Sequence, residues 1–200
     1  MRTLLHSGME SYNAKEQKKF LDKRIIIFNE DVNDAIVEDM MMYIFKWNQE
    51  DQDVPVNSRK KIRIYFNSYG GDAHICGAFC SLVKASKTPV VAVALGTVAS
   101  AAYHMYIACH ERIALDNSIF LQHEGEMSIE DSSSKLRDRM NFYDKMEERF
   151  KNNVLNNTNM DEKYYNDVYK VELWIYADKA KELGIVDKII GQDCTIDEIL

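Results

Sequence analysis

The chain has 200 residues, 46% of them hydrophobic and 28% charged, a composition typical of a folded globular protein rather than a disordered one. A formal net charge of -7 offers no positive field for nucleic acid, and the cationic run at 59–61 is interpreted as a solvated strand flank. No segment reaches the roughly 18 apolar residues that span a bilayer. The length predicts one domain, 1–200.

The N-terminal segment, 1–20, has neither the apolar stretch nor the cleavage site of a secretory signal, so nothing in it predicts export. The four cysteines lack paired CxxC spacing, which indicates a reducing cytoplasm. Cys76 and Cys80 lie one helical turn apart. Their apolar surroundings predict buried side chains rather than a metal site.

Strand and helix patterns alternate along the chain. Apolar runs predict strands at 24–28, 62–66, 90–95, 112–115 and 119–122. Helical spacing predicts helices from Asn33 through Trp47, at about 74–84 and at about 101–108. This alternation predicts an α/β fold with right-handed crossovers and a mainly parallel sheet.

The second half of the chain is expected to contain one long, charged, amphipathic helix, from about 129 to 153, followed by shorter helices. Short apolar runs at 185–186 and 189–190 close the chain. We find no internal repeat, low-complexity tract or linker that would divide it.

Two adjacent glycines, Gly70 and Gly71, follow the predicted strand 62–66 and precede a predicted helix. Glycine there permits the positive φ of a tight turn. A turn without side chains also leaves backbone N–H groups available to an anion or a developing oxyanion. The glycines by themselves leave both interpretations open.

Ser100 lies where the predicted strand 90–95 turns into a helix, and its neighbours are small: Gly96, Ala99, Ala101 and Ala102. A lone serine in this place is more often a helix N-cap than a nucleophile. Small neighbours, however, let a substrate backbone approach the hydroxyl, and a sharp strand-to-helix elbow is a recurrent way to present a nucleophilic serine. That second interpretation requires a histidine nearby, because a serine hydroxyl needs a base to accept its proton.

His123 directly follows the predicted strand 119–122. Adjacent strands of a parallel sheet bring their ends together, and an imidazole suits the role of general base near neutral pH. His104 lies one helical turn after Ser100, and its ring is expected to point away from the elbow. His104 and three further histidines are interpreted as surface or satisfied residues: His6, His74 and His110.

Several segments together resemble the Clp protease proteolytic subunit, the ClpP family. They are 67–71 (NSYGG), 88–102 (TPVVAVALGTVASAA), 114–118 (ALDNS), 121–123 (LQH) and 176–187 (YADKAKELGIVD). The similarity extends from about Tyr12 to Ile190. It implies the ClpP/crotonase-like fold of repeated β-β-α units, with a mainly parallel sheet and a protruding long helix.

The resemblance implies a serine endopeptidase. Ser100 is then the nucleophile, His123 the base, and the backbone N–H groups of Gly70, Gly71 and Ala101 the oxyanion donors. The implied partners are polypeptide substrates, further copies of the chain in stacked rings joined by the helix at 129–153, and an AAA+ unfoldase. No metal or organic cofactor is required, and the sequence has neither an HExxH motif nor a phosphate loop.

The sequence also departs from the family pattern. Tyr69 stands for the usual proline, Ala101 for a methionine, and residues 124–130 for a glycine-rich segment. The third catalytic residue of the family is an aspartate, and Glu172 is expected to replace it because a carboxylate of either length can fix the imidazole tautomer. Asp167 is a competitor for that role. These departures indicate a divergent member and leave the ATPase partner open.

Two other functions remain open. A crotonase-type acyl-CoA enzyme would share the architecture and hold a thioester enolate with paired backbone N–H groups, without needing Ser100 and His123 together. A catalytically silent ring subunit is the other alternative, and Glu172 in place of aspartate is the feature that favours it.

Overall fold

A seven-stranded sheet forms the centre of the chain in the computed structural model, which describes residues 17–126 and 130–200. Its order is β1-β2-β3-β4-β7, with β5 pairing to β3 and β6 to β5. Every pairing is parallel except that of β5 with β6, which confirms the predicted α/β fold. The strands are β1 (Ile25–Phe28), β2 (Ile62–Ser68), β3 (Val90–Ala99), β4 (Glu111–Ala114), β5 (Ile119–Gln122), β6 (Leu173–Tyr176) and β7 (Lys188–Ile189).

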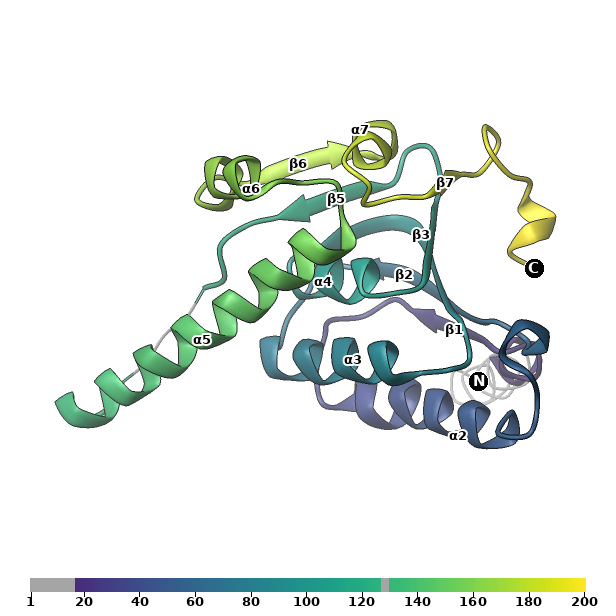
Figure 1. Ribbon diagram of the computed structural model, residues 1–200, viewed down its shortest axis with the longest axis horizontal. Helices are drawn as coiled ribbons and strands as arrows, with labels where there is room; N and C mark the ends of the chain where they lie inside the picture. The colour runs from purple at the N-terminus through teal and green to yellow at the C-terminus, as the bar shows by residue number, and fades with distance from the viewer. Residues whose placement is uncertain (1–16, 127–129) are drawn as a thin grey trace, which may run out of the picture.

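Both faces of the sheet are covered. Successive side chains of the central strand β3 point to opposite faces, and each set packs into its own cluster. Val90, Ala92 and Ala94 pack into the larger core under the helices. Val91 and Val93 point the other way, into a smaller cluster that includes Ile199 near the C-terminus. The helices on the first face are α2 (Met42–Glu50), α3 (Ala73–Ala85) and α4 (Ala101–Ile107), and a π-helical turn, η1 (Val37–Met41), precedes α2 (Figure 1).

Strand β3 runs past the predicted end at Leu95 as far as Ala99. Its first half pairs with β4, and its second half pairs with β5, where Ala99 lies beside Leu121. The sequence hides this continuation because Gly96 and Thr97 interrupt the apolar run. Because of this extension, β3 and β5 end side by side at one edge of the sheet.

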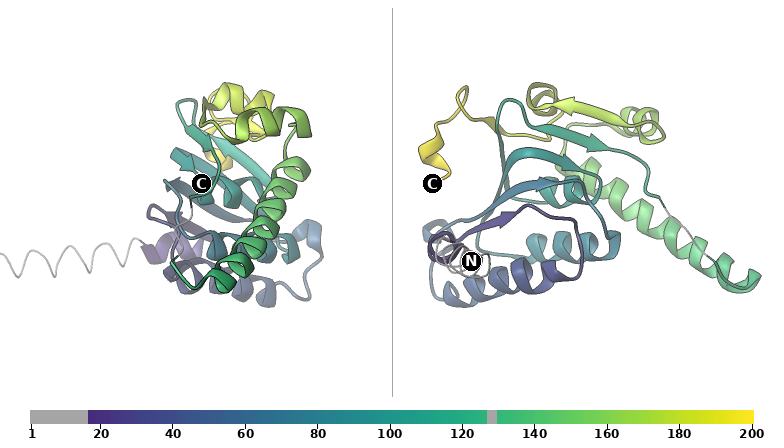
Figure 2. Two further views of the ribbon diagram at one scale, coloured as in Figure 1. Left: turned by 90° about the vertical axis from the view of Figure 1, so that its left-hand side faces the viewer. Right: turned by 180° about the vertical axis from the view of Figure 1, so that it is seen from behind.

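The long helix α5 (Ser133–Asn157) projects beyond the rest of the described chain (Figures 1 and 2). It was expected at about 129 to 153; residue 129 lies outside the described residues, and the helix continues to Asn157. Its buried residues, Phe150 and Val154, lie near its C-terminal end, where it packs against α4. The remaining helices are α6 (Glu162–Tyr169), α7 (Ala177–Glu182) and two short 3-10 turns, η2 (Val56–Ser58) and η3 (Ile196–Glu198).

Within residues 17–126 and 130–200, no helix has both the length and the apolar character needed to cross a membrane. Cys76 is buried as expected, and Cys80 is partly exposed.

Candidate active site

Ser100 occupies a sharp turn between the end of β3 and the start of α4. Its φ of 55° and ψ of -124° lie in a region that residues other than glycine seldom adopt. The Ser100 N–H donates to the Leu121 carbonyl at 3.0 Å, and the Cys76 thiol donates to the Ala101 carbonyl at 3.2 Å. The Ser100 side chain makes no N-cap hydrogen bond within the described chain, so capping does not account for this serine.

Gly70 packs directly against this elbow, and Gly71 packs against the backbone of Val32. Their φ values are 104° and 142°, in the range that favours glycine. A Cβ added to Gly70 would lie 2.7 Å from the Ser100 Cβ and 3.0 Å from the Ala101 nitrogen. The backbone at Gly70 therefore approaches Ser100 more closely than any residue with a side chain would allow.

The backbone N–H groups around Ser100 differ in whether they already have an acceptor. The Gly70 N–H donates to the Ser68 hydroxyl at 3.2 Å. In the β-bridge between Val32 and Gly71, the Val32 N–H donates to the Gly70 carbonyl and the Asp72 N–H donates to the Val32 carbonyl. The N–H of Gly71 itself takes no part in this bridge. Among the described residues, no acceptor faces the N–H of Gly71 or of Ala101. These two groups remain available, whereas Gly70 supplies the close approach.

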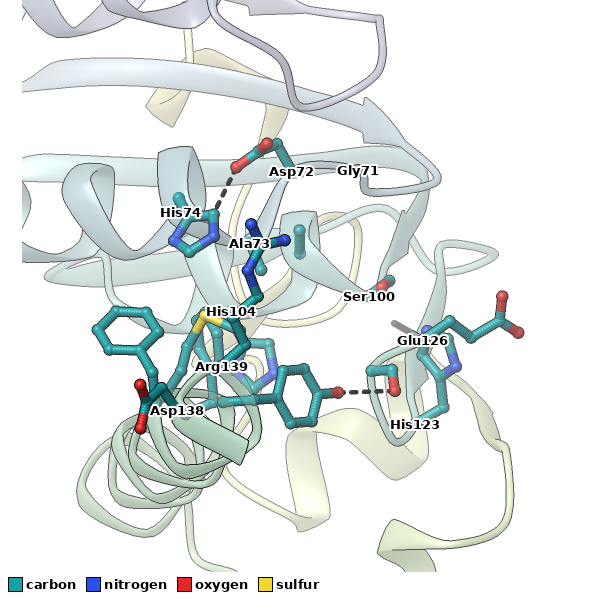
Figure 3. Close-up of a pocket in the computed structure, with 16 residues that line it drawn as sticks. Gly71, Asp72, Ala73, His74, Ser100, His104, His123, Glu126, Asp138 and Arg139 are labelled. Atoms are coloured by element: carbon teal, nitrogen blue, oxygen red, sulfur yellow. Dashed lines mark hydrogen bonds between the residues drawn. The ribbon is translucent and has the colours of Figure 1, made fainter. Parts of the chain in front are cut away.

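His123 leaves the sheet beside Ser100. Because Ala99 pairs with Leu121 in parallel register, the two residues follow adjacent strands at the same edge. Both line one cavity, which Figure 3 shows. In the described chain no hydrogen bond joins their side chains; catalytic hydrogen bonds are often long in substrate-free sites and tighten when substrate binds.

The residue expected to orient His123, Glu172, directly precedes β6. In the antiparallel pairing of β5 with β6, Gln122 faces Leu173, so one further step places the backbone of Glu172 opposite His123. The Glu172 carboxylate accepts a hydrogen bond from the Trp174 indole N–H at 2.8 Å and is exposed. Asp167 is exposed on α6. Neither carboxylate lines the cavity, and the assignment of the third residue stays a prediction.

A cavity of about 750 Å³ opens beside Ser100 (Figure 3). Its walls come from the start of α3, from α4, from the chain after β5 and from the inner side of α5. The wall on α5 is formed by the charged Asp138 and Arg139 toward the start of the helix and then by Phe142, Tyr143, Met146 and Phe150. The cavity is large enough for a bulky side chain whose backbone lies at the Ser100 hydroxyl.

His104 lines this same cavity, so the expectation that its ring points away from the site is wrong. Its ring centroid lies 4.6 Å from that of Phe150. The expectation failed because α5 packs on α4 and closes the cavity over His104. Burial, with a further contribution from His123, lowers the pKa of His104 to about 3, so the ring is neutral. It is not a satisfied histidine, because no described residue is a hydrogen-bond partner for its buried Nδ1.

A carboxylate that the sequence does not single out, Glu147 on α5, lies close to the segment after His123. The Tyr169 hydroxyl donates to the Glu147 carboxylate, and the Tyr143 hydroxyl donates to the Gly125 carbonyl at 2.8 Å. Burial raises the pKa of Glu147, against the opposing effects of Tyr143 and His123. In so highly charged a helix, no sequence signal separates Glu147 from its neighbours.

Comparisons with known proteins agree with this architecture. A model of the Clp protease family matches residues 8–193. The ATP-dependent Clp protease proteolytic subunit 2 of Treponema denticola is 26% identical over 174 residues, which cover 86% of this chain and 84% of the relative. The corresponding subunit 3 of Rhizobium etli is 30% identical over 142 residues, 70% of this chain and 73% of the relative.

A solved structure shows the same fold. A mutant of ClpP1 from Listeria monocytogenes superposes with a TM-score of 0.76 and 22% identity, covering 92% of this chain and 99% of that one. Identity this low supports a common fold and leaves the activity to be argued from the residues of the site.

Proposed function

This chain belongs to the Clp protease family, and on that premise we propose that it is a serine endopeptidase with Ser100 as nucleophile and His123 as general base. One observation carries the proposal. Ser100 sits at a positive-φ elbow on the same sheet edge as His123, and both side chains line a cavity of about 750 Å³. A strained serine without a capping role, next to a histidine, suits nucleophilic catalysis.

The mechanism follows from these positions. His123 accepts the Ser100 proton while the hydroxyl oxygen attacks a peptide carbonyl, and the N–H groups of Gly71 and Ala101 donate to the oxyanion. His123 then gives the proton to the leaving amine, which departs and leaves an acyl-enzyme. Water, activated by His123, releases the second product and restores Ser100.

Glu172 is the proposed third residue. The β5–β6 register supports it, since His123 and Glu172 occupy facing positions one step beyond the last described pair. To reach the imidazole, the carboxylate has to exchange its hydrogen bond from Trp174 for one from His123. Its role would be to hold the ring in the tautomer that accepts the serine proton.

Assembly into stacked rings is also part of the proposal. Large apolar side chains are exposed on the protruding helix α5 and on β6, namely Met140, Phe142, Trp174 and Tyr176. Exposed apolar side chains on the projecting helix α5 and on the edge strand β6 indicate contact with other chains. An AAA+ unfoldase as partner rests on the family resemblance alone, and a cytoplasmic location rests on the unpaired spacing of the four cysteines.

The test is hydrolysis of short fluorogenic peptides by the wild type and by Ser100→Ala. We expect the variant to lose at least about 1000-fold in turnover while its circular dichroism spectrum is unchanged. Ser81→Ala, an exposed serine on α3 whose hydroxyl donates to the Gly77 carbonyl, is the matched control and should keep full activity.

The same experiment separates the rival functions. A wild type that assembles but hydrolyses no peptide would favour the catalytically silent ring subunit. Hydrolysis that survives in Ser100→Ala would remove Ser100 from the mechanism. Turnover of an acyl-CoA thioester that does not depend on Ser100 would favour the crotonase-type enzyme.

A further inference from the structure

We propose that His104 makes the cavity beside Ser100 select substrate side chains with an uncharged hydrogen-bonding group at their tip, such as tyrosine and glutamine, over apolar side chains of similar size. The side chain concerned belongs to the residue whose carbonyl Ser100 attacks. The inference rests on the proposed peptidase function and adds a substrate class to it.

The position of His104 supports this role. It lies one turn after Ser100 on α4 and lines the cavity together with Phe142, Met146 and Phe150. Its backbone carbonyl accepts a hydrogen bond from Asn153 Nδ2 at 3.0 Å. On its other sides the ring contacts Tyr103 and Phe150, with centroid distances of 5.5 Å and 4.6 Å. These contacts fix the ring in the cavity wall.

The two ring nitrogens of His104 are in different surroundings. Nδ1 is sealed from solvent and has no hydrogen-bond partner within the described chain, whereas Nε2 is not sealed. Nε2 is therefore the polar atom that this ring can present to a ligand. The neutral ring carries its proton on one of the two nitrogens. With the proton on Nε2, the buried Nδ1 has only an unpaired lone pair and no unpaired N–H group, and the Nε2–H becomes a hydrogen-bond donor to the cavity.

The rest of the cavity decides which ligand tips are suitable. An apolar tip would cover the Nε2–H and leave it without an acceptor, which carries a cost in binding. A charged tip at the His104 ring would lose its water against Phe142, Met146 and Phe150 and would meet a neutral ring; the carboxylates of the lining, Asp72, Glu126 and Asp138, come from other parts of the wall. Arg139, which also lines the cavity, already pairs with Asp131 at 3.0 Å. A phenol or a carboxamide satisfies the donor and packs its hydrocarbon part on the apolar wall.

The test compares kcat/KM for two matched pairs of fluorogenic peptides that differ at this residue, tyrosine against phenylalanine and glutamine against methionine. The wild type should favour the polar member of each pair by about 2- to 10-fold, as expected for one net hydrogen bond between neutral groups. His104→Phe should bring both ratios to about 1. His110→Phe changes an exposed histidine that follows α4 and lies outside the cavity, and it should leave both ratios as in the wild type.

Failure of this inference differs from failure of the proposed function. Hydrolysis of all four peptides with both wild-type ratios near 1 overturns the role of His104 and leaves the peptidase intact. Ratios that persist in His104→Phe also overturn it, whatever the ratios in His110→Phe. If His104→Phe does not assemble, His104→Leu replaces it and should likewise bring both ratios to about 1. Absence of any Ser100-dependent hydrolysis sinks the proposed function itself.

Discussion

The backbone of Gly70 lies so close to Ser100 that a methyl group on Gly70 would stand 2.7 Å from the Ser100 Cβ. Because Gly70 also has a φ of 104°, an alanine there is strained even before it meets the serine. Gly70→Ala is therefore expected to displace the elbow and the Ala101 N–H. We expect kcat/KM for peptide hydrolysis to fall by about 100-fold or more, the effect of losing one oxyanion donor.

Gly77 provides the control for this prediction. It lies within α3, where an added Cβ would meet nothing within 4 Å. Gly77→Ala should leave peptide hydrolysis unchanged and raise the free energy of unfolding by about 0.5–1 kcal/mol, because glycine is unfavourable in a helix interior. Equal activity in the two variants would show that the approach of Gly70 to Ser100 has no catalytic importance.

Three carboxylates compete for the role of orienting His123, and one set of substitutions separates them. Glu172→Gln should lower kcat by roughly 10⁴-fold if its amide can no longer hold the correct tautomer. Asp167→Asn and Glu147→Gln should retain most of the activity. Each variant is first checked for assembly by sedimentation. A collapse in Glu147→Gln or Asp167→Asn, with Glu172→Gln near normal, would transfer the role to that residue.

The neutral His104 should make the fold sensitive to acid. Burial lowers its pKa to about 3 in the folded chain, while an unfolded histidine titrates near pH 6.5. As the pH falls below about 6.5, the unfolded chain binds a proton that the folded chain does not. The free energy of unfolding should therefore fall through this window, by at most about 1.4 kcal/mol per pH unit.

The measurement is urea unfolding at pH 7.5 and pH 5.0 for the wild type and His104→Gln. The wild type should lose up to about 2 kcal/mol more than the variant between these pH values. Identical losses would mean that His104 accepts a proton in the folded chain.

Charge on the protruding helix should weaken assembly. Met140 on α5 is 46% exposed, and Met140→Glu places a carboxylate on the helix proposed to join the rings. We expect smaller species by sedimentation velocity at micromolar concentration. Ile196→Glu puts the same charge on η3, which lies at the other end of the molecule from α5 in Figure 1, and should sediment as the wild type does. Unchanged assembly in both variants would argue against the contact through α5.

Much of the fold could be predicted from local sequence patterns. Short apolar runs locate the strands, and the alternation of strands with helices leads to a mainly parallel sheet. The placement of Ser100 beside His123 at one sheet edge follows from the same reasoning. The extension of β3 to Ala99 could not be predicted, because it depends on pairing with β5 and not on a continuous apolar run.

The walls of the site could not be predicted because they depend on long-range packing. The ring of His104 faces the cavity because α5 covers α4, and the sequence gives no measure of that contact. Likewise, Glu147 meets Tyr169 only after the chain has turned back after α5. The sequence also does not reveal that the Gly70 N–H, a candidate oxyanion donor, donates to the hydroxyl of Ser68 two residues away.

The central claim is that Ser100 is an activated nucleophile, and labelling with a fluorophosphonate probe tests it most directly. The probe reacts with a serine only when a base activates its hydroxyl. We predict a single adduct that mass spectrometry of the digested protein maps to Ser100, and loss of that adduct in both Ser100→Ala and His123→Ala. An assembled, folded wild type that takes up no probe, or takes it up at another serine, would contradict the account.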